Sequence, residues 1–414
     1  MARAIALVAG VDPLEDIGAG HTSYVRAHAR AVTRAGFEPH IFCGSPSTTV
    51  VETDLGVIHR IGVSPRIFRQ IMVPVHGRFI AASLERFLLE APGPHLIHGF
   101  GAWSYVGAFV SQALRRRGVE ATSIASAYTT LRHESHGKVR GLTSAHGRLR
   151  RLRERAEHLW VRLVADRYER RGYAESRLVI VNYESVGRLL LEMHRLKVEI
   201  RKLPYAAESA FLRTATDGGP EPPNAIAALR PKEAPLVVAI SRHDPRKGID
   251  VLIRALARLR AAGVRFRACL VGRGLFLADH RRLADRLGLS DVVAIPGRVP
   301  DSYVYLQCAD AFVLPSLQEG SGSVSLIEAL QAGVAVVASR VDGIPEDVVD
   351  GDSALLVEPG NPAALSEALR RVLTDARFRQ VLARRARQTF LEKFSAEAFV
   401  EALRKTYAEL GVEP

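Results

Sequence analysis

Short apolar runs alternate with amphipathic segments along most of this chain, and this alternation restricts the fold more than any other feature. The runs have the length of β-strands, from AIALVAG at 4–10 to VAVVASR at 334–340. Runs of this kind, separated by segments with helical spacing, are typical of parallel sheets covered by helices on both faces. We therefore expect an α/β fold.

Two domains are expected, because a chain of 414 residues with 47% hydrophobic residues is long enough to form two cores of ordinary size. The segment 213–235 is rich in proline and glycine and marks the exposed margin of a linker. The predicted boundaries are 1–205, 206–385 and a C-terminal helix at 386–414. This helix either crosses back to the first domain or stays with the second, since both arrangements require the same amphipathic sequence.

The charge of the chain indicates an anionic partner. A formal net charge of +13 favours a nucleotide, a nucleic acid or an anionic lipid surface. Nucleic acid is not expected, because aromatic residues make up only 7% of the chain and are not interleaved with its basic run. Three widely spaced cysteines and the lack of an apolar run of about 20 residues favour a cytoplasmic protein without disulfides or a membrane span.

The most basic segment extends from Lys138 to Arg171. It has eleven lysines and arginines against four acidic residues, and leucines recur within it at near-helical spacing. Two interpretations are open. The segment is either a solvated helix packed on its own domain, or a helix that docks the protein peripherally on the anionic inner face of a membrane.

Two cations follow the strand-like run LVVAI. Arg242 and Lys247 lie five residues apart across an Asp-Pro turn, and Gly248 opens the next helix-like segment. Such a pair can neutralise the oxygens of a diphosphate and of a departing phosphate. No DxD pattern stands at a plausible site and the diphosphate already has two cations, so we expect neither a metal ion nor a cofactor in this protein.

A loop of small residues lies between two glutamates in PSLQEGSGSVSLIEALQAG, residues 315–333. Small residues let the backbone approach a phosphate, and the following helix adds the positive end of its dipole. The flanking carboxylates can accept hydrogen bonds from sugar hydroxyls. The candidate residues are Glu319, Gly320, Ser321, Gly322, Ser323 and Glu328.

In order and spacing, these motifs resemble the donor-binding half of glycosyltransferase family 4, the retaining enzymes of GT-B architecture. The resemblance is specific over about 236–359, which includes ISRHDPRKGIDVLIRAL, CLVGRG and VVAIPGRV, and is looser before residue 230. It implies two Rossmann-like parallel-sheet domains that face a central cleft. It also implies transfer of a hexose-type sugar from a nucleotide sugar to a hydroxyl of a lipid-linked or saccharide acceptor, with retention.

The resemblance implies a role for each matching position of the second half. Arg242 and Lys247 hold the diphosphate, Glu319 contacts hydroxyls of the donor sugar, and these three are the catalytic candidates. Glu328 takes the ribose hydroxyls and the glycine-serine turn 320–323 cradles phosphate. The stretch formed by Gly297, Arg298 and Val299 meets the base mainly through backbone groups.

The first half supplies fewer candidates. Gly18 and Gly20 match a glycine turn that faces donor and acceptor. His98 is either a substrate-binding candidate at a strand end or a packed or capping histidine. Ala127 and Tyr128 stand where many members of the family have a histidine.

Two further positions depart from the family pattern. Eight residues separate Glu319 from Glu328, one more than usual, and Tyr205-Ala206 replaces an Asn-Gly at the domain crossover. We still expect activity without the usual histidine, because the departing phosphate oxygen can itself take the acceptor's proton.

The residues leave two other classes of function open. A sugar-phosphate or glucan synthase of the GT-B class would use the same donor site and a different acceptor. A non-catalytic protein that binds nucleotide sugars or nucleic acid would show salt-dependent DNA binding without turnover.

Overall fold

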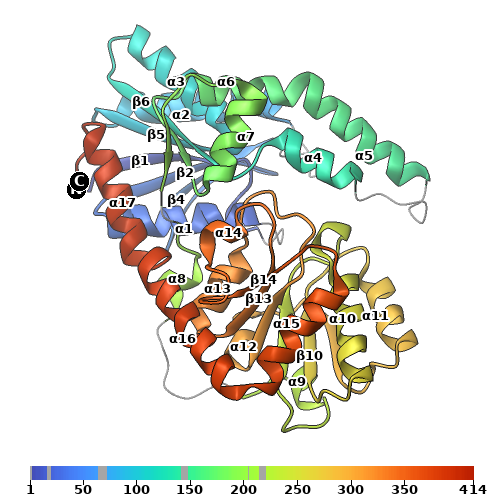
Figure 1. Cartoon of the computed structure of the whole chain (residues 1–414). Helices are drawn as coiled ribbons and strands as arrows, with labels where there is room; N and C mark the ends of the chain where they lie inside the picture. The colour runs from blue at the N-terminus through green and yellow to red at the C-terminus, as the bar shows by residue number, and fades with distance from the viewer. Residues whose placement is uncertain (1, 16–19, 64–71, 141–147, 204, 214–220) are drawn as a thin grey trace. The chain divides into compact units, whose positions relative to one another are not determined.

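The computed structural model describes residues 2–15, 20–63, 72–140, 148–203, 205–213 and 221–414 (Figure 1). The chain divides into two compact units, the first made of Met1–Leu212 with Ser395–Pro414 and the second of Arg213–Phe394. Each unit contains a mainly parallel sheet packed against helices, which confirms the predicted α/β fold with two Rossmann-like domains.

The strands of the first unit are β1 (Ala4–Val8), β2 (Glu38–Ser45), β3 (Thr49–Thr53), β4 (Gly56–Gly62), β5 (His95–Phe100), β6 (Ala121–Ala127), β7 (Val179–Val181) and β8 (Ile200–Lys202). Its helices are α1 (Gly20–Arg34), α2 (Val73–Glu90), the 3-10 helix η2 (Gly101–Trp103), α3 (Ser104–Arg116), α4 (Leu131–Arg140), α5 (Arg148–Trp160), the π-helix η3 (Val161–Ala165), α6 (Asp166–Ala174), α7 (Glu184–His194), α8 (Ser209–Leu212) and α17 (Ala396–Glu409).

Among the described residues, the first sheet has the strand order β3-β4-β2-β1-β5-β6-β7-β8. The strand pairs are parallel except for β3 with β4. Successive residues of β1 point to opposite faces, so Ile5 and Leu7 enter one core while Ala6 and Val8 enter another. Both faces of the central strands are therefore buried, as parallel sheets require.

Helix α17 completes one of these cores. Phe399, Leu403 and Tyr407 recur every four residues, lie on one face of the helix and are at most 2% exposed. Ser395 caps the helix by accepting a hydrogen bond from the backbone N–H of Ala398. Burial of each large side chain contributes about 2 kcal/mol. The first unit thus depends on a segment that follows the whole of the second unit in sequence.

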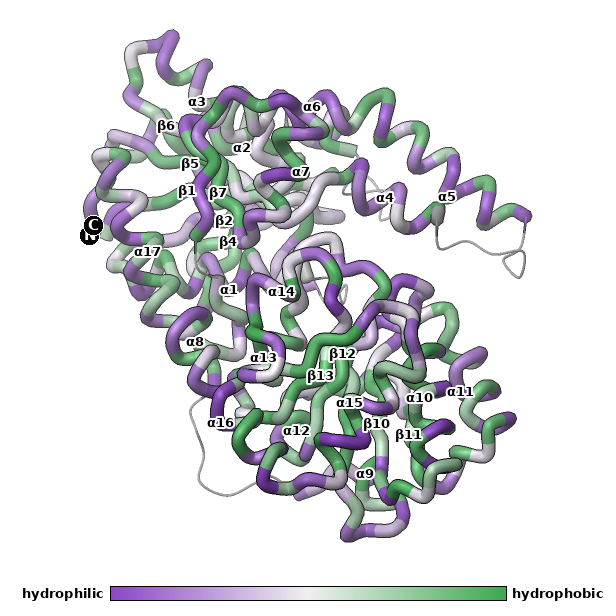
Figure 2. Tube along the Cα trace, in the orientation of Figure 1, coloured by the Kyte–Doolittle hydropathy of each residue, from purple (hydrophilic) through white to green (hydrophobic). Residues whose placement is uncertain are grey.

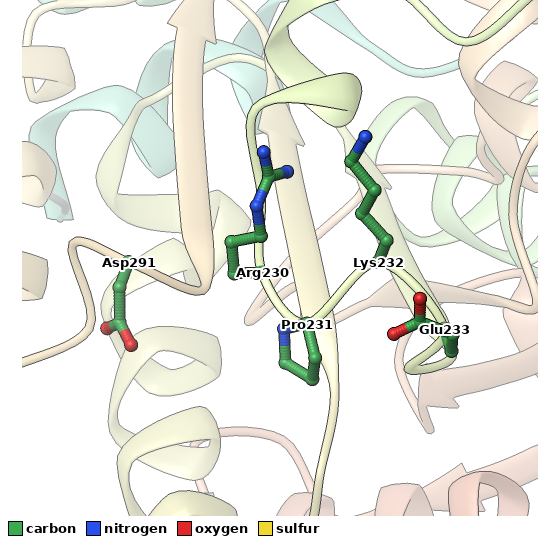
Figure 3. A pocket seen from close by; sticks show the side chains of 5 residues that line it. All are labelled: Arg230, Pro231, Lys232, Glu233 and Asp291. Carbon is green, nitrogen blue, oxygen red and sulfur yellow. The ribbon is translucent and has the colours of Figure 1, made fainter.

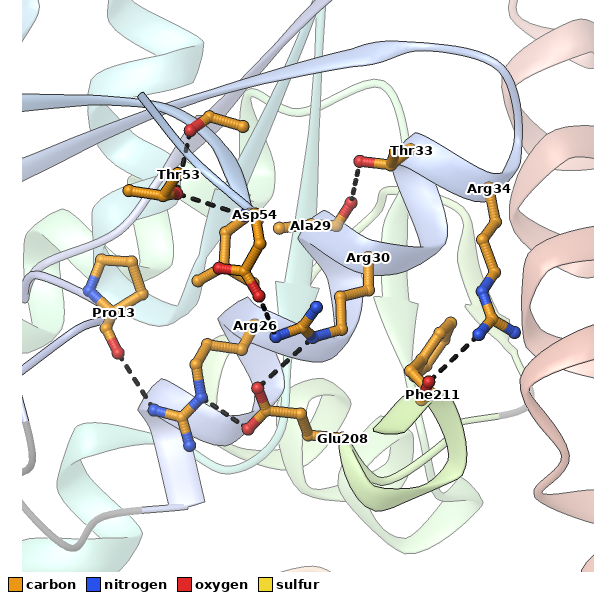
Figure 4. Close-up of polar contacts among 12 residues, drawn as sticks. Pro13, Arg26, Ala29, Arg30, Thr33, Arg34, Thr53, Asp54, Glu208 and Phe211 are labelled. Carbon is orange, nitrogen blue, oxygen red and sulfur yellow. Dashed lines mark hydrogen bonds and ion pairs between the residues drawn. The ribbon is translucent and has the colours of Figure 1, made fainter. Parts of the chain in front are cut away.

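The crossover segment 206–212 also belongs to the first unit (Figure 4). Glu208 accepts hydrogen bonds from Arg26 at 2.5 Å and from Arg30 at 3.5 Å, and both arginines project from α1. Arg34, one turn further along α1, donates to the carbonyl oxygen of Phe211 at 3.1 Å. These contacts tie the segment to α1, beyond the predicted boundary at residue 205.

The strands of the second unit are β9 (Leu236–Ile240), β10 (Arg267–Val271), β11 (Val293–Gly297), β12 (Ala311–Leu314), β13 (Ala335–Ser339) and β14 (Leu355–Val357). Its helices are α9 (Asn224–Ala227), the 3-10 helix η4 (Pro245–Lys247), α10 (Ile249–Ala261), α11 (Leu277–Arg286), α12 (Tyr303–Gln307), α13 (Val324–Ala332), α14 (Ile344–Asp347), α15 (Pro362–Thr374) and α16 (Ala376–Lys393).

The described strands of the second sheet follow the order β11-β10-β9-β12-β13-β14, and every pair is parallel. Numbered along the chain, this is the Rossmann order 3-2-1-4-5-6, in which the direction of winding reverses between the first and fourth strands. The reversal lies between β9 and β12. Ligands of such sheets bind beyond the carboxyl ends of the strands at this point.

Part of the predicted linker 213–235 packs on the second unit. Ile226 and Leu229 are buried, and the Arg230 N–H donates to the carbonyl oxygen of Asp291 at 3.3 Å. The predicted boundary at residue 385 falls inside α16, which belongs wholly to the second unit.

His28 makes the first unit sensitive to acid. It lies in α1, is 2% exposed, and packs edge-on against Phe100 and Phe399. Burial lowers its pKa to about 4, against a smaller opposing effect of its hydrogen bond to the Tyr24 carbonyl. Because the folded pKa lies below that of the unfolded chain, unfolded molecules bind more protons, and stability is lost as the pH falls from about 6.5 towards 4.

We expect His28 to account for about 2 kcal/mol of the stability lost between pH 7.5 and pH 5. Urea unfolding of wild type and His28→Gln at both pH values measures this difference. The exposed His136 offers a control, because His136→Gln should lose as much stability as wild type. Equal losses in wild type and His28→Gln would contradict the assignment.

Candidate active site

The predicted catalytic residues of the second unit meet at the point where its sheet changes winding direction. Arg242 and Lys247 follow β9, and Glu319 follows β12, the neighbouring strand. The Lys247 Nζ lies 2.5 Å from Oε2 of Glu319, so an ion pair joins the two strand ends. The chemistry predicted from two separate motifs is therefore brought together in one place.

This ion pair is shielded from water. The side chains of Lys247 and Glu319 are 13% and 4% exposed, respectively. The second carboxylate oxygen of Glu319 accepts a hydrogen bond from the Ser316 hydroxyl at 2.5 Å. Glu319 is thus fixed from two sides, and a charge pair in such a setting is worth more than the same pair in solvent.

Asp244 organises the turn that carries the cations. Its side chain accepts from the backbone N–H of Arg246 and so caps η4. The same carboxylate lies 3.7 Å from the guanidinium of Arg242 and 3.6 Å from that of Arg246. The Arg242 side chain remains 47% exposed, which leaves it accessible to an anion.

The two loops of the site are also joined through their backbones. The carbonyl oxygen of Arg246 accepts hydrogen bonds from the N–H groups of Leu317 and Gln318 at 2.7 and 3.1 Å. Between the loops, Gly248 adopts a φ of +58° and approaches Pro315 so closely that a Cβ atom would lie 2.1 Å from its carbonyl oxygen. Glycine at 248 is therefore required both by its φ and by this contact.

His243, beside Arg242, adds no charge to the site near neutral pH. It is fully buried and its Nδ1 lies 2.8 Å from Nδ1 of His280. Burial, with a smaller contribution from the nearby His280, lowers the pKa of His243 to about 4. The positive charge offered to a ligand therefore comes from Arg242, Arg246 and Lys247.

Asp342 is a residue of the site that the sequence motifs did not identify. Its carboxylate accepts from the backbone N–H groups of Glu319 and Gly320 at 2.6 and 2.7 Å. The residue adopts a φ of +46°, and the following Gly343 N–H donates to the Ser321 carbonyl at 2.7 Å. An Asp-Gly pair just beyond β13, on the same sheet edge, is the sequence signal that could have located it.

The contacts of Asp342 determine which part of the glycine-serine turn can still bind an anion from outside the protein. Two successive N–H groups that converge on one oxygen form an anion-binding nest, and here the anion is a side chain of the protein. The part of the turn nearest Glu319 is therefore held by Asp342. A phosphate would meet the later residues of the turn and the beginning of α13.

Loss of this nest contact should loosen Glu319. We expect Asp342→Ala to weaken donor binding about tenfold, because two hydrogen bonds to a charged acceptor are lost near the surface. Asp342→Asn keeps an acceptor oxygen and tolerates the left-handed backbone, so its effect should stay within about threefold. Calorimetric titration with the donor measures both, and equal affinities for Asp342→Ala and wild type would contradict the role.

The remaining candidates of the second unit lie around the same sheet edge. Glu328 lies half-buried in α13, where its charge contributes to raising the pKa of Tyr303 after the larger effect of burial. Gly297 ends β11 with a φ of +89°, and its carbonyl accepts from Gly272 at 2.9 Å. Arg298 is exposed and Val299 is half-buried just beyond it. Ser321 and Ser323 are buried within the turn, whereas Gly322 is half-buried.

The candidates of the first unit are placed differently. Gly18 lies outside the described residues, and Gly20 is the first residue of α1. His98 lies within β5 and is fully buried, with Nδ1 2.9 Å from the Tyr407 hydroxyl and Nε2 2.7 Å from Ser126 Oγ. Both ring nitrogens therefore have partners inside the core, which corrects the expectation of a histidine at a strand end.

The aromatic ring of Tyr128 fills the region just beyond β6, where the usual histidine is missing. It stacks on Tyr24 with ring centroids 3.8 Å apart, and its hydroxyl lies 3.3 Å from Nδ1 of His28. Tyr205 of the crossover packs against Tyr24 as well. These two departures from the family pattern therefore belong to one aromatic cluster.

A pocket of about 500 Å³ lies at the opposite edge of the second sheet (Figure 3). Its lining residues precede β9 and β11 and are Arg230, Pro231, Lys232, Glu233 and Asp291. The amino ends of parallel strands are not where ligands of this fold bind. We therefore place the candidate site at the carboxyl edge, around the Lys247–Glu319 pair.

Two family models match the chain in succession. Residues 19–206 match the glycosyl transferase 4-like domain, and residues 224–389 match glycosyl transferases group 1. This chain belongs to the GT-B glycosyltransferases of family 4 type. The first match falls in the first unit, and the second covers the loops around Lys247 and Glu319.

Curated relatives of this chain include a protein of lipopolysaccharide core biosynthesis and a phosphatidylinositol monomannoside mannosyltransferase. It is 31% identical over 221 residues to the lipopolysaccharide core biosynthesis glycosyltransferase LpsD of Rhizobium meliloti, a match over 53% of this chain and 63% of that protein. It is 34% identical over 174 residues to a GDP-mannose-dependent phosphatidylinositol monomannoside mannosyltransferase of Mycolicibacterium smegmatis, covering 39% and 46% of the two chains. The matches therefore span about half of the relatives' length.

Solved structures share the fold of this chain over almost its whole length. Sucrose-phosphate synthase from Thermosynechococcus elongatus has a TM-score of 0.74 at 23% identity, with 99% of each chain covered. The Anabaena HepE protein in complex with UDP-glucose has a TM-score of 0.66 at 17% identity, with 98% of this chain and 99% of that chain covered. At these identities the likeness concerns the fold, which is GT-B.

Proposed function

We propose that this protein transfers a hexose-type sugar from a nucleoside diphosphate sugar to a hydroxyl group of a lipid-linked or saccharide acceptor, with retention and without a metal ion. The observation that carries the proposal is the shielded Lys247–Glu319 pair at the switch point of the second sheet, with Arg242 exposed beside it. Cations for a diphosphate and a carboxylate for sugar hydroxyls are thus adjacent. One relative is GDP-mannose-dependent and one structural neighbour is in complex with UDP-glucose, and both compounds are nucleoside diphosphate sugars.

The proposed reaction follows from these charges. The bond between the anomeric carbon and the phosphate oxygen breaks, and the acceptor oxygen bonds to the same face of that carbon. The departing phosphate oxygen takes the acceptor's proton, while Arg242 and Lys247 stabilise the negative charge that develops on the diphosphate. Glu319, held by Ser316, orients the sugar through its hydroxyls.

A ligand panel tests the donor half of this proposal. Melting temperatures measured with UDP-, GDP- and ADP-sugars, each with and without a chelator, should rise for one nucleotide sugar, because binding at about 100 times Kd stabilises a protein by about 2.7 kcal/mol. The increase in melting temperature should be the same with the chelator present, because the proposed binding needs no metal ion. If none of the compounds binds at millimolar concentration, the proposed donor site is wrong.

Turnover with candidate acceptors tests the other half. Transfer to a lipid-linked or saccharide hydroxyl is the expected result, and NMR of the product should show the anomeric configuration of the donor. Efficient transfer to a soluble sugar phosphate would instead assign the protein to the sugar-phosphate synthases of the same fold.

We also propose that the basic segment Lys138–Arg171 docks on an anionic membrane, where a lipid-linked acceptor would be found. Helix α5 places hydrophobic and hydrophilic residues in alternation (Figure 2), and its Leu149 and Leu152 are 86% and 63% exposed. Arginines lie on the same helix, so apolar anchors and positive charge occur together. In the described part of the chain, no helix is both long and apolar enough to cross a membrane.

Vesicle sedimentation tests the docking. We expect binding to vesicles with anionic lipid, weaker binding at high salt, and at least about tenfold weaker binding for Leu149→Gln combined with Leu152→Gln. Leu191→Gln, which changes a leucine that is 49% exposed on α7, is the matched control and should bind normally. Equal binding to neutral and anionic vesicles would contradict the proposal. Release of the protein from anionic vesicles by random DNA would contradict it as well.

A further inference from the structure

Three potential metal ligands converge inside the first unit, in a part of the fold that the proposed sugar transfer does not use. Asp166 and Glu169 lie three residues apart in the first turn of α6 and so share one face. His194 is the last residue of α7. One donor atom from each of the three side chains lies within 4.8 Å of the others.

The cluster is buried and its hydrogen bonding is incomplete. Glu169 and His194 are 1% and 2% exposed. Among the described residues, neither ring nitrogen of His194 has a hydrogen-bond partner, and neither has Oδ1 of Asp166. The nitrogens lie 3.9 Å from Asp166 and 3.8 Å from Glu169, beyond hydrogen-bond length. A buried polar group without a partner is destabilising, so such a group usually indicates an additional partner.

The charge of the cluster points to the same kind of partner. In the described part of the chain, the ion pairs of Asp166 and Glu169 are made with His194 and not with a lysine or arginine. Two carboxylates around one imidazole leave a negative charge that a divalent cation would neutralise.

The surroundings hold the ligands in position. Both carboxylate oxygens of Glu169 accept from the Leu131 N–H, at 3.2 and 3.0 Å, and the Tyr173 hydroxyl donates to one of them at 3.3 Å. Hydrogen bonds of this kind orient the carboxylate ligands of metal ions. The π-helical turn Val161–Ala165 directly precedes Asp166, and such turns change the direction of the side chains that follow them.

We propose that Asp166, Glu169 and His194 bind a divalent transition-metal ion, of which Zn²⁺ is the best match to one imidazole and two carboxylates. Ligands about 2.0 to 2.2 Å from Zn²⁺ lie about 3.5 Å from one another in a tetrahedral site, so binding must draw the donor atoms together by about 1 Å. Side-chain rotation can supply this movement. A water molecule would be the fourth ligand.

The ion would have a structural role. It would join α6 to the end of α7, and through Glu169 and the Leu131 N–H it would also hold the beginning of α4. This site lies in the first unit, whereas the predicted cations and carboxylates for the donor lie in the second, so the inference does not depend on the proposed function.

Metal analysis of the full-length protein tests the inference. After removal of metals with a chelator and titration with ZnCl₂, wild type should bind about one equivalent of Zn²⁺ and its melting temperature should rise. The variants His194→Gln and Asp166→Asn should each fail to bind this equivalent of Zn²⁺, and their melting temperatures should not rise on addition of ZnCl₂. His40→Gln removes another histidine 3.8 Å from a single carboxylate, that of Glu38, and should bind Zn²⁺ as wild type does.

A second measurement avoids variants that fail to fold. Co²⁺ bound to wild type should show the visible absorption of a tetrahedral site, and added Zn²⁺ should remove it. If wild type binds no Zn²⁺, or if both variants fold and still bind it, the inference is wrong. It is also wrong if ¹⁵N NMR shows His194 with protons on both nitrogens that Zn²⁺ does not displace, because the imidazolium would then be the cation of the cluster.

Discussion

Replacement of Lys247 by alanine is expected to lower the rate of sugar transfer about 10²- to 10³-fold, the usual effect of removing one preorganised contact to a charged transition state. Lys247 is the last residue of η4, which follows β9, and its Nζ lies 2.5 Å from Oε2 of Glu319. Without it, the charge that develops on the departing diphosphate loses a fixed and partly desolvated cation. Replacement of Arg242 by alanine should lower the rate to a similar extent.

Two comparisons show whether this loss is chemical. Arg340→Ala breaks an ion pair of 2.5 Å with Asp350 whose partners are 44% and 43% exposed, so activity and stability should change little. Lys247→Ala leaves Glu319 buried with Ser316 as its remaining side-chain partner, so the melting temperature must be measured with kcat and KM. If Lys247→Ala and Arg242→Ala both keep turnover within a few-fold of wild type, the site is assigned wrongly.

Gly248→Ala should destabilise the second unit and weaken donor binding, because the added Cβ would lie 2.1 Å from the carbonyl oxygen of Pro315. Relief of this clash requires the turn that carries Lys247 to move away from the loop that carries Glu319. We expect the free energy of unfolding to fall by at least about 3 kcal/mol, the sum of left-handed backbone strain and the clash.

Gly351 provides a matched control for this substitution. It also lies in the second unit and has a φ of +77°, but nothing lies within 4 Å of the position of its Cβ. Gly351→Ala should therefore cost only the strain of the left-handed backbone, about 1 to 2 kcal/mol. Urea unfolding of both variants separates the two effects, and equal losses would show that the contact with Pro315 is unimportant.

The sequence predicted much of the second unit, because its strands are buried on both faces and appear as continuous apolar runs. The loops after β9 and β12 were also predictable, since glycine, proline and charged residues interrupt the apolar pattern at those points. Strands β3, β4, β8 and β14 were missed, because the first three mix polar with apolar residues and β14 has only three residues.

The parts of the site that could not be predicted depend on contacts between distant segments. His98 looks like a strand-end histidine in sequence, and only the packing of Tyr407, 309 residues further along, shows that it lies in the core. Asp342 is an ordinary loop residue until β13 is placed beside β12. The amphipathic pattern of α17 is the same whichever unit it packs on, so its place required the three-dimensional structure.

The return of α17 to the first unit has a consequence for the order of folding during synthesis. Every residue of the second unit leaves the ribosome before Ser395–Pro414 does. The second unit can therefore fold while the hydrophobic core of the first unit still lacks helix α17. Until then, the side chains that contact Phe399, Leu403 and Tyr407 stay open to solvent and to chaperones. The domain that begins first is therefore the one that is finished last.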